Sequence, residues 1–160
     1  CHIRDERGLL PTDGTCRECD GVGADGMKLI PATVADCAHL AHMNQQLIIA
    51  EGSDNPMNHA QLTARMQGFL QGTYQAWLFE SAHGVVGYTL VDMARNPRYV
   101  RHFYVEAPQR RQGIGRQAFA LLKAQLAHQP VELDVLITNP AGLAFWQALG
   151  LVPRSICLRG

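Results

Sequence analysis

Apolar residues recur along most of this chain with the periods of helices and strands, and the regular pattern begins at Met27. Val131, Leu133, Val135 and Ile137 alternate against Glu132 and Asp134, which is typical of a half-buried strand. Over residues 113–128 the apolar positions fall three and four apart, as on the buried face of a helix. The same reasoning predicts ten elements: strand 27–30, helices 34–50 and 59–70, strands 74–80, 85–92 and 98–105, helix 113–128, strand 131–137, helix 141–149 and strand 155–158.

The order of these elements, β-α-α-β-β-β-α-β-α-β, predicts the fold class. His83 and Gly84 suit the turn of a hairpin, so the three consecutive strands should form an antiparallel meander. The strand, helix and strand around residues 113–128 favour a parallel pair. We therefore expect an α/β protein of the α+β kind, with a mixed, mostly antiparallel sheet flanked by helices. In the first helix, which Thr33 would cap, we expect one buried face, formed by Val34, Cys37, Ala38, Ala41 and Ile48.

Residues 1–26 differ from the rest, because they carry scattered glycines and charges and no apolar period. We predict an irregular N-terminal arm over 1–26, dispensable for folding and activity, and one folded domain over 27–160. Cys16-x-x-Cys19, with Cys1 and His2, offers four ligands that a zinc ion accepts. A structural zinc site usually has two separate ligand pairs, whereas Cys1 and His2 are adjacent at one end of the sequence. We therefore expect no metal.

Composition narrows the range of partners. The 160 residues suit one domain, and the 14 basic and 14 acidic residues balance, so no nucleic acid or membrane surface is expected as a partner. No apolar run reaches the length of a membrane-spanning helix, and no segment resembles a secretory signal peptide. A cytoplasmic location is therefore expected.

The segment with the clearest chemistry is 105–116, which reads VEAPQRRQGIGR. A predicted strand ends and a predicted helix begins here, and a helix N-terminus presents free N–H groups that bind phosphate. Gly113 and Gly115 leave room for a pyrophosphate, and three positive charges surround it, those of Arg110, Arg111 and Arg116. The segment lacks the Gly-Lys-Ser/Thr ending of a P-loop and the third glycine of the dinucleotide fingerprint. A plain strand-to-helix turn is the other interpretation.

Two motifs resemble the GNAT family of N-acetyltransferases. RRQGIG, residues 110–115, is similar to the family's Arg/Gln-x-x-Gly-x-Gly/Ala turn, and Phe103-Tyr104-Val105 before it resembles the family's fourth strand. NPAGLAFWQALGL, residues 139–151, resembles a later motif in which an asparagine is followed by an aromatic pair. The two motifs occur in the family's order, and the resemblance covers residues 27–159.

The resemblance implies that acetyl-CoA is the co-substrate. Its acetyl group would pass to a primary amine of a small molecule or peptide by direct attack, without a covalent enzyme intermediate. A catalytically weak module that binds or senses acetyl-CoA is the alternative. Many family members are dimers, which leaves a homodimer open. The residues that the resemblance assigns to acetyl-CoA are Tyr104, Val105, Arg110, Arg111, Gln112, Gly113, Ile114, Gly115, Arg116, Asn139 and Phe145.

The chain departs from the family pattern at two positions. Trp146 stands where many members place a tyrosine acid, and an indole N–H donates a hydrogen bond but gives up no proton. We expect Trp146 to line the acyl pocket, and a plain core aromatic is the alternative. Arg101 stands where some relatives place a carboxylate base, and it cannot act as one. We expect Arg101 to bind an acidic group of the acceptor, unless it pairs with a nearby carboxylate.

The loop between the first two helices borders the acceptor site in this family. Glu51 is our candidate for the catalytic base and Asn55 for an acceptor contact, with solvated loop residues as the alternative. Strand alternation predicts that Arg101, Phe103 and Val105 share the face turned to the cleft. His102 should then point to the opposite face, as a packed histidine.

Overall fold

The computed structural model describes residues 26–107, 110 and 113–160. The predicted arm, apart from Gly26, and the four candidate zinc ligands lie outside these residues. Within the described residues, no group of three or more His, Cys, Asp or Glu side chains could hold a metal ion. None of the helices described is long and apolar enough to cross a membrane.

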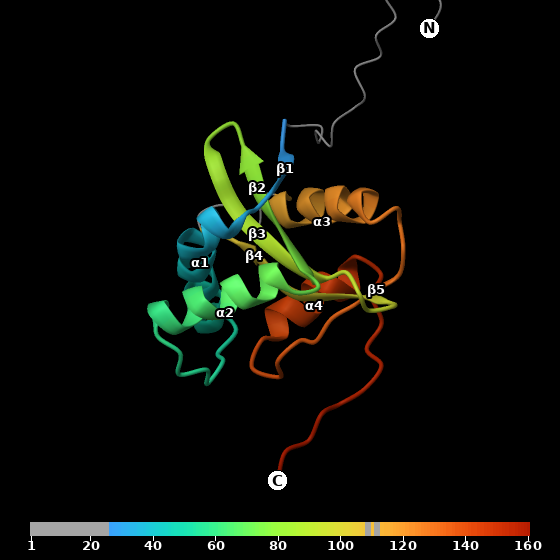
Figure 1. Cartoon of the computed structure of the whole chain (residues 1–160). Coiled ribbons are helices and arrows are strands. Elements are labelled where there is room, and N and C mark those ends of the chain that lie inside the picture. Colours follow the sequence, from blue (N-terminus) through green and yellow to red (C-terminus); the bar gives the residue numbers. More distant parts are fainter. Residues whose placement is uncertain (1–25, 108–109, 111–112) are drawn as a thin grey trace, which may run out of the picture.

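One sheet of five strands forms the centre of the fold (Figure 1). Its strands are adjacent in chain order, from β1 to β5. The first four pair antiparallel, and β4 pairs parallel with β5, which confirms the predicted mixed sheet. The strand bounds are β1 Lys28–Pro31, β2 Tyr74–Ser81, β3 Gly84–Asp92, β4 Arg98–Val105 and β5 Val131–Glu132.

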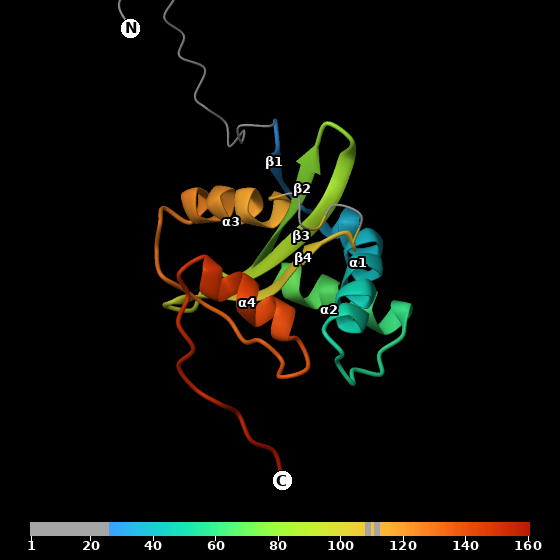
Figure 2. The same ribbon diagram turned by 180° about the vertical axis from the view of Figure 1, so that it is seen from behind.

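Helices cover both faces of this sheet (Figures 1 and 2). On one face, Leu40 of the first helix and Met66 of the second pack with Tyr88 of β3. On the other, Leu122 and Trp146 pack with strand residues such as Trp77. Because both faces are covered, the central strands read as nearly continuous apolar runs. The helical bounds are a 3-10 turn η1 Val34–Asp36, α1 Cys37–Ala50, α2 His59–Gln71, α3 Ile114–Gln125 and α4 Pro140–Ala148.

The buried face of α1 differs from the predicted one. Thr33 precedes a 3-10 turn, so Val34 lies ahead of the α-helix with 47% of its surface exposed, and Ala38 is exposed as well. The prediction ignored polar residues, but the polar Asn44 is buried in the middle of the face. The buried residues of α1 are Cys37, Leu40, Ala41, Met43, Asn44 and Leu47.

The last two predicted strands differ most from the structure. The predicted strand 131–137 pairs with β4 only over Val131–Glu132. Leu133 and Val135 still pack inward while Asp134 stays exposed, but Ile137 is 95% exposed, so the alternation predicts burial correctly only as far as Val135. The predicted strand 155–158 is wrong, because these residues form no strand and lie exposed. No strand edge lies beside them to supply hydrogen bonds, and apolar spacing alone cannot provide one.

Gly87 provides a test of the contact between β3 and β4. It lies opposite Val105, and a Cβ atom there would overlap the carbonyl oxygen of Tyr104. Gly87→Ala should therefore lower the free energy of unfolding by about 1–3 kcal/mol. Gly68→Ala is the matched control, because a Cβ on this residue of α2 meets nothing within 4 Å, and it should stabilise by about 0.5–1 kcal/mol. Urea denaturation measures both, and equal midpoints would contradict the assigned register.

Candidate functional site

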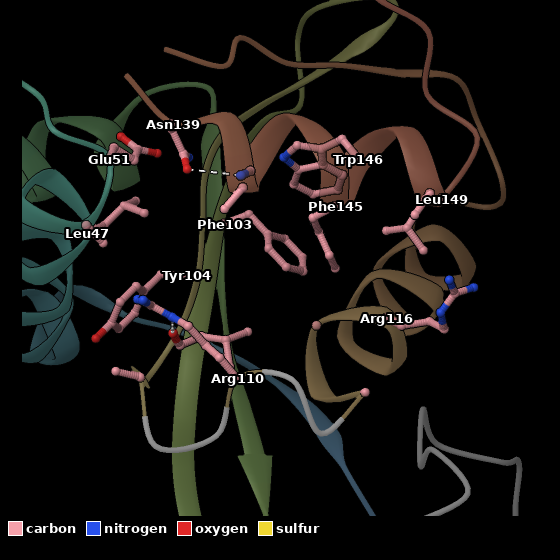
Figure 3. A pocket seen from close by; sticks show the side chains of 18 residues that line it. Leu47, Glu51, Phe103, Tyr104, Arg110, Arg116, Asn139, Phe145, Trp146 and Leu149 are labelled. Atoms are coloured by element: carbon pink, nitrogen blue, oxygen red, sulfur yellow. Dashed lines mark hydrogen bonds between the residues drawn. The ribbon is translucent and has the colours of Figure 1, made fainter. Parts of the chain in front are cut away.

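A pocket of about 720 Å³ opens where β4 and the chain after β5 move apart (Figure 3). The C-terminal end of α1, the end of β4, the N-terminus of α3 and most of α4 surround it. Three segments distant in the sequence therefore supply its walls: the end of α1, the stretch from the end of β4 into α3, and α4 with the residue before it. Most of the site residues that the sequence predicted line this pocket. They are Glu51, Tyr104, Val105, Arg110, Gly113, Gly115, Arg116, Asn139, Phe145 and Trp146.

Arg110 contacts the C-terminal end of β4. Its Nε donates to the Val105 carbonyl oxygen over 2.8 Å, and its guanidinium carbon lies 5.6 Å from the centre of the Tyr104 ring. The Val105 carbonyl therefore already has a donor within the protein. The terminal nitrogens of Arg110 have no acceptor among the described residues and remain free for an anion in the pocket.

The two glycines at the start of α3 serve different purposes. Gly113 caps α3 with φ of +76°, and a Cβ on it would meet nothing within 4 Å, so a side chain would both strain the backbone and occupy open space. Gly115 lies against α4, because its Cβ would come within 3.0 Å of the Phe145 ring. The sequence suggested one reason for both, whereas Gly115 also lets α3 and α4 approach. Arg111 and Gln112 lie outside the described residues, and Ile114 packs into the core.

The wall formed by α4 is aromatic. The Trp146 ring meets Phe103, Phe119 and Phe145 edge to face, with ring centres 5.0, 5.2 and 4.8 Å away. Trp146 thus belongs to the core and also lines the pocket, so the two interpretations of this residue are compatible. Its indole nitrogen has no acceptor among the described residues and lies at the end of the ring nearer Asn139 (Figure 3).

Asn139 fixes the start of α4. Its side-chain oxygen accepts a hydrogen bond from the Gly142 backbone N–H over 3.0 Å, and Pro140 follows at the first helical position (Figure 3). Both features are common at helix N-termini. The structure therefore gives Asn139 a capping role, and its side chain also lines the pocket.

Glu51 stands at the C-terminal end of α1 and reaches the same pocket. Its backbone carbonyl accepts a hydrogen bond from the Thr138 hydroxyl over 2.6 Å, which joins the loop after α1 to the turn before α4. Burial raises the pKa of the Glu51 carboxyl. Sequence reasoning missed Thr138, although its hydroxyl directly precedes the Asn139 motif.

The segment after β5 has a second attachment. The Tyr99 hydroxyl of β4 donates to the Asp134 carboxylate over 2.6 Å. Burial, together with this hydrogen bond and the charge of Asp134, raises the pKa of Tyr99 to about 12. Residues 133–138 are therefore held at both ends, by Tyr99 and by Glu51, although they do not pair with β4.

Arg101 does not line the pocket, and the expected sharing of faces along β4 is wrong. Leu90 pairs with His102 but Val91 pairs with Val100, so Arg101 is the extra residue of a β-bulge. A bulge interrupts the alternation of side chains. Arg101 therefore lies with Phe69 on the α2 side, where His102 also lies, while Phe103 packs toward Phe119 on the other side.

The two other assignments in this region also change. No carboxylate of the described residues lies within ion-pair distance of Arg101, so the alternative of a carboxylate partner is not supported within this part of the chain. Asn55 lies outside the pocket lining, and its side-chain oxygen accepts from the Met57 N–H over 3.0 Å. That oxygen therefore shapes the loop between α1 and α2.

A layer of buried polar groups lies between β3, β4 and the first two helices. The Tyr88 hydroxyl and His102 Nδ1 are 3.0 Å apart, and Arg65 donates to the Asn44 side-chain oxygen over 3.0 Å. Burial, with the charges of Arg65 and Arg101, lowers the pKa of His102 to about 3. His102 is therefore neutral at ordinary pH, as expected of a packed histidine.

Solved structures of acetyltransferases share this fold. A possible acetyltransferase from Clostridium difficile 630 is 18% identical with a TM-score of 0.67, over 84% of this chain and 95% of that one. A predicted acetyltransferase from Clostridium acetobutylicum, crystallised with acetyl-CoA, is 16% identical with a TM-score of 0.65, over 83% and 94%. A ribosomal-protein-alanine N-acetyltransferase from Brucella melitensis biovar Abortus 2308 is 16% identical with a TM-score of 0.66, over 84% and 99%.

A comparison of sequences gives the family. No match to the chain was found among curated proteins. The family model of the acetyltransferase (GNAT) domain matches residues 39–151, which is well over half of the 160 residues and includes both motifs and every residue that lines the pocket. The chain therefore belongs to the GNAT family of acetyltransferases.

Proposed function

We propose that this acetyltransferase moves the acetyl group of acetyl-CoA to a primary amine of a small molecule or peptide. One observation carries the proposal: a single pocket joins an anion-binding helix N-terminus to a half-buried carboxylate, that of Glu51. The fold neighbour crystallised with acetyl-CoA and the neighbour named as an N-acetyltransferase support it.

The α3 end of the pocket suits the pyrophosphate of coenzyme A. The first turn of a helix offers unpaired N–H groups and a partial positive charge. The open space at Gly113 lets a phosphate approach them, and Arg110 and Arg116 line the pocket beside it. We assign Arg111, Gln112 and Ile114 to the same turn, through their backbone N–H groups. Tyr104 and Val105 would face the pantetheine arm.

The other end suits the acetyl group and the amine. Phe103, Phe145 and Trp146 form an apolar wall that excludes water from a thioester. The free indole N–H of Trp146 would donate to the carbonyl oxygen as negative charge develops on it. The amine nitrogen forms a bond to the carbonyl carbon, the C–S bond breaks, and the thiolate leaves and takes a proton from water. Asn139 would hold this end of the pocket.

Glu51 would accept the proton that the attacking amine loses. Burial holds its pKa above that of an ordinary carboxyl, which makes its carboxylate a better proton acceptor.

A module that binds acetyl-CoA without turnover is the second candidate. Trp146 favours it, because this residue stands where a tyrosine acid would stand and its N–H gives up no proton. Release of coenzyme A over a panel of amines separates the two, since the binding module would hold acetyl-CoA and release nothing.

Gly113→Asp tests the position of acetyl-CoA. The new carboxylate would occupy the open space before α3 and repel the pyrophosphate, so the dissociation constant measured by calorimetry should rise at least about tenfold. Gly84→Asp is the matched control, because Gly84 also has positive φ and open space but is the first residue of β3 and does not line the pocket. If both variants bind acetyl-CoA like the parent, the site is elsewhere.

Glu51→Gln tests the proton acceptor. The carboxylate must be ionised to act, so kcat/KM should fall as the pH drops through its raised pKa. In Glu51→Gln, kcat/KM should be lower by at least about tenfold, and this acid limb should vanish. Acetyl-CoA affinity should not change.

Asp54→Asn provides the control, because Asp54 is an exposed carboxylate three residues further along the same loop. Its pH profile should match the parent. Parental turnover in Glu51→Gln would remove Glu51 as the base and leave an ordered water in that role.

A further inference from the structure

Two arginines lie over one aromatic ring on the face of the sheet that α1 and α2 cover. The guanidinium carbon of Arg65 is 5.6 Å from the centre of the Phe69 ring, and that of Arg101 is 5.3 Å from it. Arg65 comes from the middle of α2, and Arg101 from the bulge of β4. Arg101 also lies 5.4 Å from the Tyr74 ring and 5.5 Å from the Tyr99 ring. Two like charges thus lie beside the same aromatic ring.

Neither guanidinium has a negatively charged partner in the described part of the chain. Arg101 Nε donates to the Tyr74 hydroxyl over 2.8 Å, and Arg65 Nη2 donates to the Asn44 side-chain oxygen. Both acceptors are neutral. The Nε of Arg65 is buried and has no acceptor among the residues that the structure describes.

This arrangement opposes folding. Burial lowers the pKa of Arg65, and the charge of Arg101 lowers it further, although Tyr88 acts in the other direction. A partly buried charge without a counter-ion costs free energy, as does a buried N–H without an acceptor. Residues that break such rules are concentrated at functional sites, where a ligand supplies what the protein lacks. An anion is the ligand that two guanidinium groups lack.

Arg101 belongs to the strand whose last residues line the pocket. Arg101 precedes Tyr104 by three residues on β4, and Tyr104 lines the pocket, so they are roughly 10 Å apart at the rise of a strand. Burial raises the pKa of Tyr88, and the charges of both Arg65 and Glu51 act on it as well. The two arginines thus lie on the face of the sheet that α1 and α2 cover, and Glu51 stands at the C-terminal end of α1.

We propose that Arg65 and Arg101 form a carboxylate-binding subsite, so that the acceptor is an amine with an acidic group at the end of an extended spacer. The inference rests on the proposed function, since it names the acceptor class. A carboxylate between the two guanidinium groups accepts hydrogen bonds from their terminal nitrogens and supplies the missing negative charge. Stacking on Phe69 holds the guanidinium planes in place and lowers the entropy lost on binding.

A binding experiment tests the subsite without any turnover. The probes are 6-aminohexanoate and its neutral amide, 6-aminohexanamide, which differ only in the negative charge. The Nε–H resonances of Arg65 and Arg101 are followed by NMR as each probe is added. We expect saturable shifts of both resonances with the acid and none with the amide.

Arg101→Met and Arg95→Met form a matched pair of variants. Both arginines are exposed and lie over aromatic rings, but Arg95 stacks only on Tyr99, at 4.1 Å. Arg101→Met should abolish the shift of Arg65 by the acid, and Arg95→Met should leave it intact. Because Arg101 is exposed, its loss should not prevent folding, and thermal denaturation checks this.

Turnover with acetyl-CoA gives the second readout. The acid should be acetylated at least about tenfold more efficiently than the amide in the parent, as expected for a charge-assisted pair. The ratio of kcat/KM values should approach one in Arg101→Met and stay unchanged in Arg95→Met, with the KM for acetyl-CoA constant in both.

The outcomes separate this inference from the function on which it rests. Absent shifts, equal shifts with acid and amide, or shifts that persist in Arg101→Met would overturn the subsite. Acid-specific shifts without acetylation of either probe or of a wider amine panel would uphold the subsite and contradict the proposed transfer.

Discussion

The parallel pairing of β4 with β5 lasts for two residues, Arg98 with Val131 and Tyr99 with Glu132. Beyond Tyr99 none of the described strands lies beside the outer edge of β4, although its backbone groups still need partners. Arg110 supplies one at the Val105 carbonyl, and the pocket occupies the remaining space. If the pairing continued to residue 137, as its apolar alternation suggests, the sheet would be closed where the pocket now lies. The site therefore depends on where one short ladder of hydrogen bonds ends.

The two faces of the sheet differ in polarity. The face under α3 and α4 is apolar and aromatic, and it continues into the pocket wall through Phe145 and Trp146. The face under α1 and α2 contains buried polar groups, among them Asn44 and His102. Polar groups in a core limit packing to arrangements that satisfy them. In the proposed function, the apolar face would adjoin the thioester and the polar face would adjoin a charged acceptor. Strand β4 contributes side chains to both faces.

The sequence was sufficient to predict the features that depend on periodicity or on a local turn. The meander, the helices and the turn at Gly113 follow from apolar spacing, glycines and arginines within a few residues of one another. Periodicity indicates which residues are buried, but it does not indicate which backbone groups form hydrogen bonds. For this reason the early end of β5 was not predicted. The bulge at Arg101 left no recognisable mark, and one inserted residue changes the face of a side chain. Arg65 and Asn44 were missed because a polar residue within a helix is usually assigned to its exposed side.

The hydrogen bond from the Thr138 hydroxyl to the Glu51 carbonyl joins parts of the chain 87 residues apart. The same hydroxyl lies 3.4 Å from the Gly52 carbonyl, and the Glu51 N–H donates to the Leu47 carbonyl at the end of α1. A bond of this kind contributes about 1 kcal/mol net to stability. One hydroxyl group therefore helps to set the position of the residue proposed as the base relative to the turn that leads into the aromatic wall of α4.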